Sequence, residues 1–212
     1  MRRKIIRASL REAMAGNRDS MSNDDLRTNP ATEILIAENI KVLRQSQKLI
    51  AQMGDRLFAE ITAPTLTSSV GAQFRHCLDF YQCFLRGMKN NKIDYDQRER
   101  NELLETDRTR AMERIEALSE GLWKLSFGEE QATLWVKQDS PYWSVSSLRR
   151  ELQFLLSHTV HHQALIGLML QVQGFVPEPE IGVAPSTLEH RKAPRHVFGR
   201  LVSRPPRLSL VL

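Results

Sequence analysis

Apolar residues recur at intervals of three, four and seven in four segments of the chain, which is the spacing of amphipathic α-helices. The predicted helices span residues 32–61, 68–88, 98–125 and 147–173. The second has aromatic and aliphatic residues on more than one side, which indicates burial among several neighbours. The third has one apolar stripe and densely charged other faces, which is typical of a helix exposed to solvent.

Candidate capping residues support two of these boundaries. Thr32 can cap the first helix, and Ser147, with Ser144 and Ser146 before it, can cap the fourth. Gly174 is a suitable stop for the fourth helix, and Pro64 follows the expected end of the first.

The fourth helix carries three histidines in its apolar stripe. On a helical wheel, His158 shares a face with several residues, and the opposite face is expected to point away from the core. The His158 face contains Glu151, Phe154, Leu155, His161, His162, Leu165, Met169 and Val172. The opposite face contains Arg149, Gln153, Gln163, Gly167 and Gln171. Imidazole is costly on a core-facing stripe unless both ring nitrogens find partners, and a metal ion is one such partner.

The connections complete the expected architecture. Residues 126–146 form the longest connector, and the run ATLWVKQ within it alternates as a short strand would. Such a long connector suggests a crossover between the third and fourth helices. The fold class that follows is all-α, a four-helix bundle with one long crossover.

The chain length suits one domain with terminal extensions. We expect a flexible extension at residues 1–30, which includes a possible short amphipathic helix at 5–14, and a bundle at 31–188. A basic tail follows at 189–212, and its end is expected to be poorly ordered. The segment after Gly174 has four prolines in twenty residues and is expected to contain no helix.

Charge and composition narrow the function classes. The net charge of +5 arises from the ends, +3 in residues 1–30 and +5 in residues 189–212, so the body carries about −3. This distribution argues against a specific nucleic-acid surface. No apolar run reaches the roughly 18 residues of a membrane span, and no secretory signal is evident. Cys77 and Cys83 should diverge on one helix, so a reducing, cytoplasmic location is expected.

The histidines give the main chemical hypothesis. His158 and His162 are four residues apart, so both rings can reach one ion from the same face of the helix. His76, on the second helix, is the third candidate ligand. Three neutral imidazoles leave an open coordination position for water, thiolate or a carbonyl oxygen. His161 is expected at the pocket edge, as a candidate base with Glu151 behind it.

Structural explanations stand beside this hypothesis. The histidines could form a buried polar layer that sets helix register. Asp79 is either an acceptor for a metal-bound histidine or a surface residue, and Cys83 is interpreted as core. Arg98, in a group with Tyr95, Asp96 and Arg100, could position an anionic substrate, although a helix start explains the group equally well. The remaining aromatic residues are expected to serve packing rather than a ligand cage; they are Trp123, Trp135, Tyr142 and Trp143.

The chain resembles the DinB-like four-helix metalloproteins, a superfamily that includes metal-dependent thiol S-transferases. The resemblance rests on FRHCLDFYQ with His76, on SHTVHHQALIG with His158 and His162, and on the segments IDYDQRER, LLETDRTRA and GVAPSTL. It implies an up-down-down-up bundle, a divalent ion on the three histidines and a homodimer. Nickel or zinc is the metal expected, with manganese or iron as alternatives.

Two functions are therefore expected to compete. The first is an enzyme that transfers a low-molecular-weight thiol, or hydrolyses a small substrate, with the metal activating thiolate or water. The second is a metal- or small-ligand-binding module without turnover. Fold does not decide between them.

Overall fold

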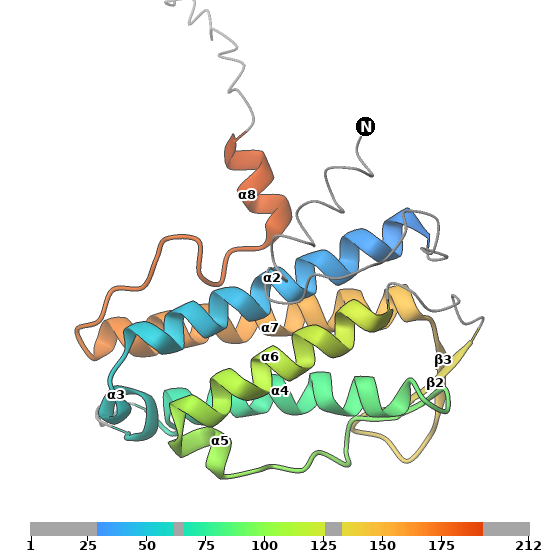
Figure 1. Ribbon diagram of the computed structural model, residues 1–212, viewed down its shortest axis with the longest axis horizontal. Coiled ribbons are helices and arrows are strands. Elements are labelled where there is room, and N and C mark those ends of the chain that lie inside the picture. Colours follow the sequence, from blue (N-terminus) through green and yellow to red (C-terminus); the bar gives the residue numbers. More distant parts are fainter. Residues whose placement is uncertain (1–28, 62–65, 126–132, 193–212) are drawn as a thin grey trace, which may run out of the picture.

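Four long helices carry the core of the protein, as the computed structural model of residues 29–61, 66–125 and 133–192 shows (Figure 1). They are α2 (Pro30–Gln52), α4 (Val70–Gly87), α6 (Arg108–Leu125) and α7 (Leu148–Val172). Three short helices accompany them: α3 (Asp55–Ala59), α5 (Leu103–Thr106) and α8 (Pro185–Lys192). The prediction of an all-α bundle is confirmed, with one small sheet added at its side.

Contacts between the helices give their directions. α2 and α7 are parallel, because Asn39 bonds the Leu152 carbonyl and Gln163, further along α7, bonds that of Val42. α2 and α6 are antiparallel, because Arg44 pairs with Glu116 in the middle of α6, while Arg108 at its start reaches Met53 after α2. α4 packs between α6 and α7, and α2 packs against the same two helices from the other side.

α4 and α6 are parallel and point opposite to α2 and α7 (Figure 1). A Cβ atom at Gly71, at the start of α4, would overlap the Glu105 carbonyl just before α6, and Leu85 meets Gly121 near the other end of both helices. Because α4 and α6 are parallel, the chain between them returns along the bundle (Figure 1). The long crossover therefore joins the second and third long helices, and its predicted place between the third and fourth is wrong, since α6 and α7 run in opposite directions.

The sheet contains strands from two connectors. β1 (Lys92–Asp94) pairs in parallel with β2 (Leu134–Lys137), and β2 pairs antiparallel with β3 (Ser144–Ser146). The strand expected in ATLWVKQ is therefore present as β2. β1 was missed, because three residues in a polar loop are too few to show alternation.

The first helix differs at both ends from its prediction. Asn29 caps it, with its side chain accepting from the Ala31 amide at 2.9 Å, whereas Thr32 is fully buried. α2 ends at Gln52, before Gly54, and α3 follows as a separate helix. The predicted single helix to Ile61 is therefore wrong. Gly54 was not interpreted as a helix break, because no capping residue beside it marked a helix end.

Two further helix predictions need correction. The third helix begins at Arg108 rather than near Arg98, because Arg100 and the residues around it form a loop before α5. The segment after Gly174 contains α8, which was not expected. α8 is compatible with its proline because Pro185 is its first residue, where a missing amide hydrogen costs no helical hydrogen bond.

Caps on the two site-bearing helices are as expected for serine. Ser69 accepts from the Ala72 amide at 3.0 Å at the start of α4, and Ser147 accepts from Arg150 at 3.3 Å at the start of α7. Gly174 has a φ of +80°, a left-handed conformation that glycine adopts without steric cost.

The centre of the bundle contains a polar network that does not involve the histidines. The Tyr81 hydroxyl donates to Asn39 Oδ1 at 2.7 Å, and Asn39 Nδ2 donates to the carbonyls of Leu35 and Leu152. Thr159 lies against the same tyrosine hydroxyl at 3.2 Å. These bonds tie α2, α4 and α7 together. A buried polar layer, considered above for the histidines, is therefore formed by Asn39, Tyr81 and Thr159.

The wheel assignment of α7 is partly wrong. Gln163 and Gly167, assigned to the outer face, are buried, and Gln163 bonds Ser46 on α2. Leu165 and Val172, assigned to the core, are exposed. α7 packs against both α2 and α4, so its buried surface is wider than one stripe.

The expected helix at 5–14 and the end of the basic tail lie outside the residues that the structure describes. Within the described residues, no helix combines the length and hydrophobicity required to cross a membrane.

Candidate metal centre

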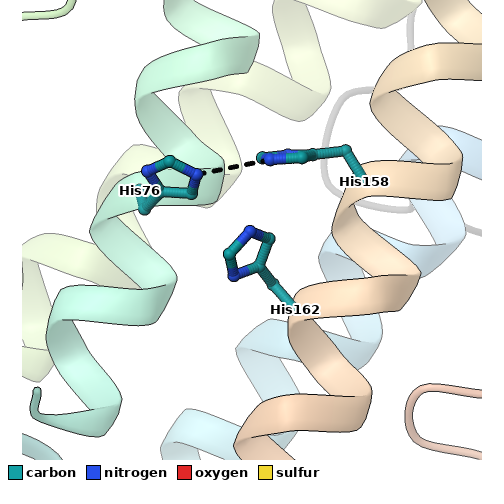
Figure 2. A group of neighbouring side chains, drawn as sticks. All are labelled: His76, His158 and His162. Atoms are coloured by element: carbon teal, nitrogen blue, oxygen red, sulfur yellow. Dashed lines mark hydrogen bonds between the residues drawn. The ribbon is translucent and has the colours of Figure 1, made fainter. Parts of the chain in front are cut away.

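The three predicted ligands converge between α4 and α7. Figure 2 shows His76 projecting from α4 toward His158 and His162, which lie one turn apart on α7. One ring nitrogen from each histidine lies within 4.8 Å of the corresponding atoms of the other two. The four-residue spacing on α7 brings the pair together, and the antiparallel packing of α4 supplies the third ring.

The closest approach is between two nitrogens of the same kind. Nε2 of His76 and Nε2 of His158 are 3.3 Å apart. Two nitrogens bound to one zinc ion at about 2.05 Å with tetrahedral geometry would be about 3.3 Å apart. The separation therefore suits two ligands of a common ion, as well as a hydrogen bond between one protonated and one bare nitrogen.

A glutamine fixes the tautomer of the third ring. Nδ1 of His162 lies 2.8 Å from Oε1 of Gln73, and the amide nitrogen of Gln73 donates to Ser68 at 2.7 Å. Because Oε1 can only accept, Nδ1 of neutral His162 carries the proton. Nε2 of His162 is then left with a lone pair, which is the state that a metal ligand requires.

The environment keeps the imidazoles neutral. Burial, followed by the charge of His162 and of Arg98 and Arg75, lowers the pKa of His76 to about 4. Burial, followed by the neighbouring imidazoles and Arg98, lowers the pKa of His158 to about 3. The pKa of His162 is also lowered, first by burial and then by His161. At neutral pH the three rings hold lone pairs without competition from protons.

Aromatic rings cover one side of the cluster. Phe80 packs against His158 at 4.3 Å between ring centroids and against His76 at 5.1 Å, and Phe154 stacks on His158 at 5.5 Å. This apolar cover explains the burial that lowers the histidine pKa values. It also lowers the local dielectric constant, which strengthens any charge interaction inside the site.

One polar atom in the cluster is unsatisfied. Nδ1 of His158 is buried without a hydrogen-bond partner among the described residues. Nε2 of His158 has a hydrogen-bond partner in His76, so described protein groups satisfy one of the two ring nitrogens of His158. The donor set of three imidazole nitrogens without a carboxylate fits zinc, nickel, iron or copper in preference to calcium or magnesium.

His161 and Glu151 occupy different surroundings. His161 is exposed, and its ring meets that of His162 edge-on at 5.3 Å. Glu151 is buried and accepts hydrogen bonds from the Tyr95 hydroxyl at 2.9 Å and from Ser146. Burial, and then the Glu151 charge, raises the pKa of Tyr95, so this hydroxyl stays protonated. Glu151 reaches the cluster indirectly, through Tyr95, whose ring packs on Phe80 and Phe154.

Other residues singled out in the sequence also have defined positions. Asp79 is buried and pairs with Arg75 at 3.2 Å, so it is neither a surface residue nor a histidine acceptor as first considered. Burial raises its pKa, and the bond from Arg75 opposes that shift. Cys77 and Cys83 are buried free thiols, and burial raises the pKa of both.

Tyr142, in the long connector, borders a separate hollow. A surface pocket of about 530 Å³ lies between the β2–β3 hairpin and the start of α7. Its lining residues are Val136, Gln138, Ser140, Tyr142, Ser144, Val145, Ser146, Ser147, Arg150 and Glu151. Tyr142 is 78% exposed there, while Trp123 packs against the core. None of the three clustered histidines lines this pocket.

A helical bundle with a half-buried group of three histidines between two antiparallel helices defines a class of candidate metal-binding proteins. The family profile described as DinB superfamily matches residues 10–166, which include all three histidines. The chain belongs to the DinB superfamily.

A curated relative is similar over a shorter stretch. The chain is 34% identical to FK506-binding protein 5 of Rhizopus delemar over 106 residues, which cover 47% of this chain and 28% of that protein. The chain thus spans little more than a quarter of this relative.

Gln73 is the contact at this site that sequence reasoning missed. It lies one turn before His76 on α4, and a polar residue in that position on a buried helix is the only local signal. Replacing Gln73 with alanine is expected to weaken zinc binding by about 10- to 100-fold, because the protonated nitrogen of His162 loses its acceptor.

Competition with a chromophoric chelator would measure this effect. Gln82→Ala, at a half-buried position on the same helix, is the matched control and should bind zinc as the unmodified protein does. Equal affinities for the two variants would show that Gln73 does not orient His162.

Proposed function

We propose that the protein binds one divalent metal ion through His76, His158 and His162 and acts on a low-molecular-weight thiol. The observation that carries the proposal is the convergence of three neutral imidazoles within 4.8 Å, with Gln73 presetting His162. Nickel or zinc is the metal proposed, with iron or manganese as the alternative, and zinc, nickel and iron are among the metals that imidazole ligands suit. When bound, such an ion lowers the pKa of a thiol or water at its open position and so supplies a nucleophile at neutral pH.

The residues of the chain have separate parts in this scheme. Phe80 and Phe154 exclude water from one side of the rings, which keeps the histidines neutral. His161, exposed beside His162, is the candidate acceptor for a proton released from the thiol. Glu151 acts as a positioning residue, because it holds Tyr95 against the phenylalanines that cover His158.

A second candidate is a metal- or ligand-binding module without turnover. This candidate is favoured because two carboxylates near the cluster already have partners and are not free to accept a proton. Asp79 pairs with Arg75, and Glu151 accepts hydrogen bonds from Tyr95 and Ser146. Of the two candidate proton acceptors, His161 and Glu151, His161 is then the one that remains available to accept a proton. The FK506-binding name of the Rhizopus relative belongs to a protein of which this chain covers only 28%, so it adds no substrate here.

Turnover separates the two candidates. Protein loaded with zinc or nickel is incubated with mercaptoethanol and chlorodinitrobenzene; in the reaction the thiolate displaces chloride and the thiol proton passes to a base. The enzyme proposal expects thioether formation above the uncatalysed rate, and loss of that excess on addition of EDTA and in His158→Ala. His190→Ala, at an exposed position on α8, is the control that keeps the rate. Tight metal binding with no excess rate across several thiols and electrophiles would instead establish the binding module.

A further inference from the structure

A charged residue, Arg98, lies beside the histidine cluster, and no carboxylate among the described residues pairs with it. Arg98 is in the loop between β1 and α5, where its guanidinium carbon lies 4.8 Å from the centroid of Phe80. The same Phe80 ring packs on both His76 and His158. Phe80 thus contacts both Arg98 and two of the candidate ligands.

Hydrogen bonding uses only part of this guanidinium. Nη1 of Arg98 donates to the Tyr95 carbonyl at 2.7 Å, which holds the side chain against the loop. Nε of Arg98 is buried and has no partner among the described residues. A guanidinium has five N–H groups, and a buried donor without an acceptor is costly enough that native proteins generally provide a partner for it.

Arg75, the other arginine near the cluster, shows the contrast. Its guanidinium pairs with Asp79 at 3.2 Å and with Glu105 at 2.8 Å, so its charge is compensated within the protein. No ion pair joins Arg98 to a carboxylate in the described part of the chain.

A guanidinium with an unpaired N–H group has a defined chemical preference. Its planar N–H groups match the two oxygens of a carboxylate and form charge-assisted hydrogen bonds with it. Phe80 holds the plane of Arg98 by a cation–π contact, which limits the entropy lost when a ligand binds.

We propose that Arg98 binds a carboxylate of the small molecule that occupies the histidine site, so that the substrate class is an anionic, carboxylate-bearing thiol. The thiol part of this assignment rests on the proposed function. The anion site itself depends only on Arg98 and its surroundings, so it can be tested with metal-free protein.

Calorimetric titration with two thiols of matched size tests the proposal. Thioglycolate carries a carboxylate, and mercaptoethanol carries a hydroxyl in its place. Each is titrated into metal-free protein in EDTA and into zinc-loaded protein. The unmodified protein is expected to bind thioglycolate about tenfold more tightly than mercaptoethanol in both states, since a charge-assisted bond is the difference between the ligands.

Three variants decide the assignment. Arg98→Met should bind the two thiols equally, with its mercaptoethanol affinity unchanged. Arg98→Lys keeps the charge and is expected to retain a reduced preference, which provides a measurement if Arg98→Met folds poorly. Arg100→Asn removes an exposed charge from the same loop, at a position whose φ of +49° asparagine tolerates, and should keep the full preference.

The outcomes distinguish the two proposals. Preference for thioglycolate in folded Arg98→Met, or no preference in the unmodified protein in either state, would overturn the role of Arg98. Failure to take up zinc while metal-free protein keeps the Arg98-dependent preference would overturn the proposed function and leave the anion site in place.

Discussion

Replacing His158 with alanine is expected to abolish stoichiometric metal binding. His158 supplies the ring nitrogen nearest to that of His76, so its loss leaves two ligands on opposite helices. Removing a residue that only orients a ligand costs about 10- to 100-fold in affinity, and loss of a ligand itself should exceed that. Elemental analysis of protein purified without a histidine tag should give about one divalent ion per chain for the unmodified protein and almost none for this variant.

A neighbouring histidine provides the matched control for this experiment. His161→Ala changes an exposed ring on the same helix and should keep its metal. Circular dichroism of all three proteins tests that the helices are intact. Equal metal content in His158→Ala and the unmodified protein, or no metal in either after incubation with zinc, nickel, manganese and iron, would rule out the three-histidine site.

Metal-free protein is expected to lose stability as the pH falls from 6.5 toward 4. The folded-state pKa values of His76 and His158, about 4 and about 3, lie below the ordinary value of 6.5. The unfolded chain therefore binds more protons in this interval, which favours unfolding at low pH. Each histidine can contribute up to about 1.4 kcal/mol per pH unit, and partial solvent exposure reduces this figure.

Urea unfolding at pH 7 and pH 5 in EDTA measures this loss. The double variant His76→Ala, His158→Ala controls for the carboxylates, which titrate in both proteins. The unmodified protein should lose about 2 kcal/mol more than the double variant between the two pH values. An equal loss in the two proteins would show that the histidines have ordinary pKa values in the folded state.

The candidate ligands illustrate what local sequence information can carry. His158 and His162 form a pair because a helix repeats every 3.6 residues, which places the fourth residue on the same face. His76 could be added because it lies on a helix whose composition indicates burial. The partners of these rings could not be predicted in the same way. Gln73 and His162 are 89 residues apart in the sequence and meet because α4 packs against α7.

Helix boundaries show the same division. Ser147 acts as a cap for an amide three residues away, so it could be recognised directly. The break after Gln52 was missed. The role of Asn29 was missed as well, because Thr32 is equally suited to capping by residue type but is buried by tertiary packing. Packing of α7 against both α2 and α4 likewise buries Gln163, a residue whose polarity suggested an outward position.

The sequence by itself determined the helical class, four long helices and the metal-ligand spacing of His158 and His162, because each depends on residue periodicity within one segment. The tertiary structure alone decided which groups surround those histidines. Glu151 is held by Tyr95, Gln73 contacts His162, and among the described residues no carboxylate pairs with Arg98 beside Phe80. These pairings join segments whose relative positions follow from the burial of the whole core, and no local pattern encodes them.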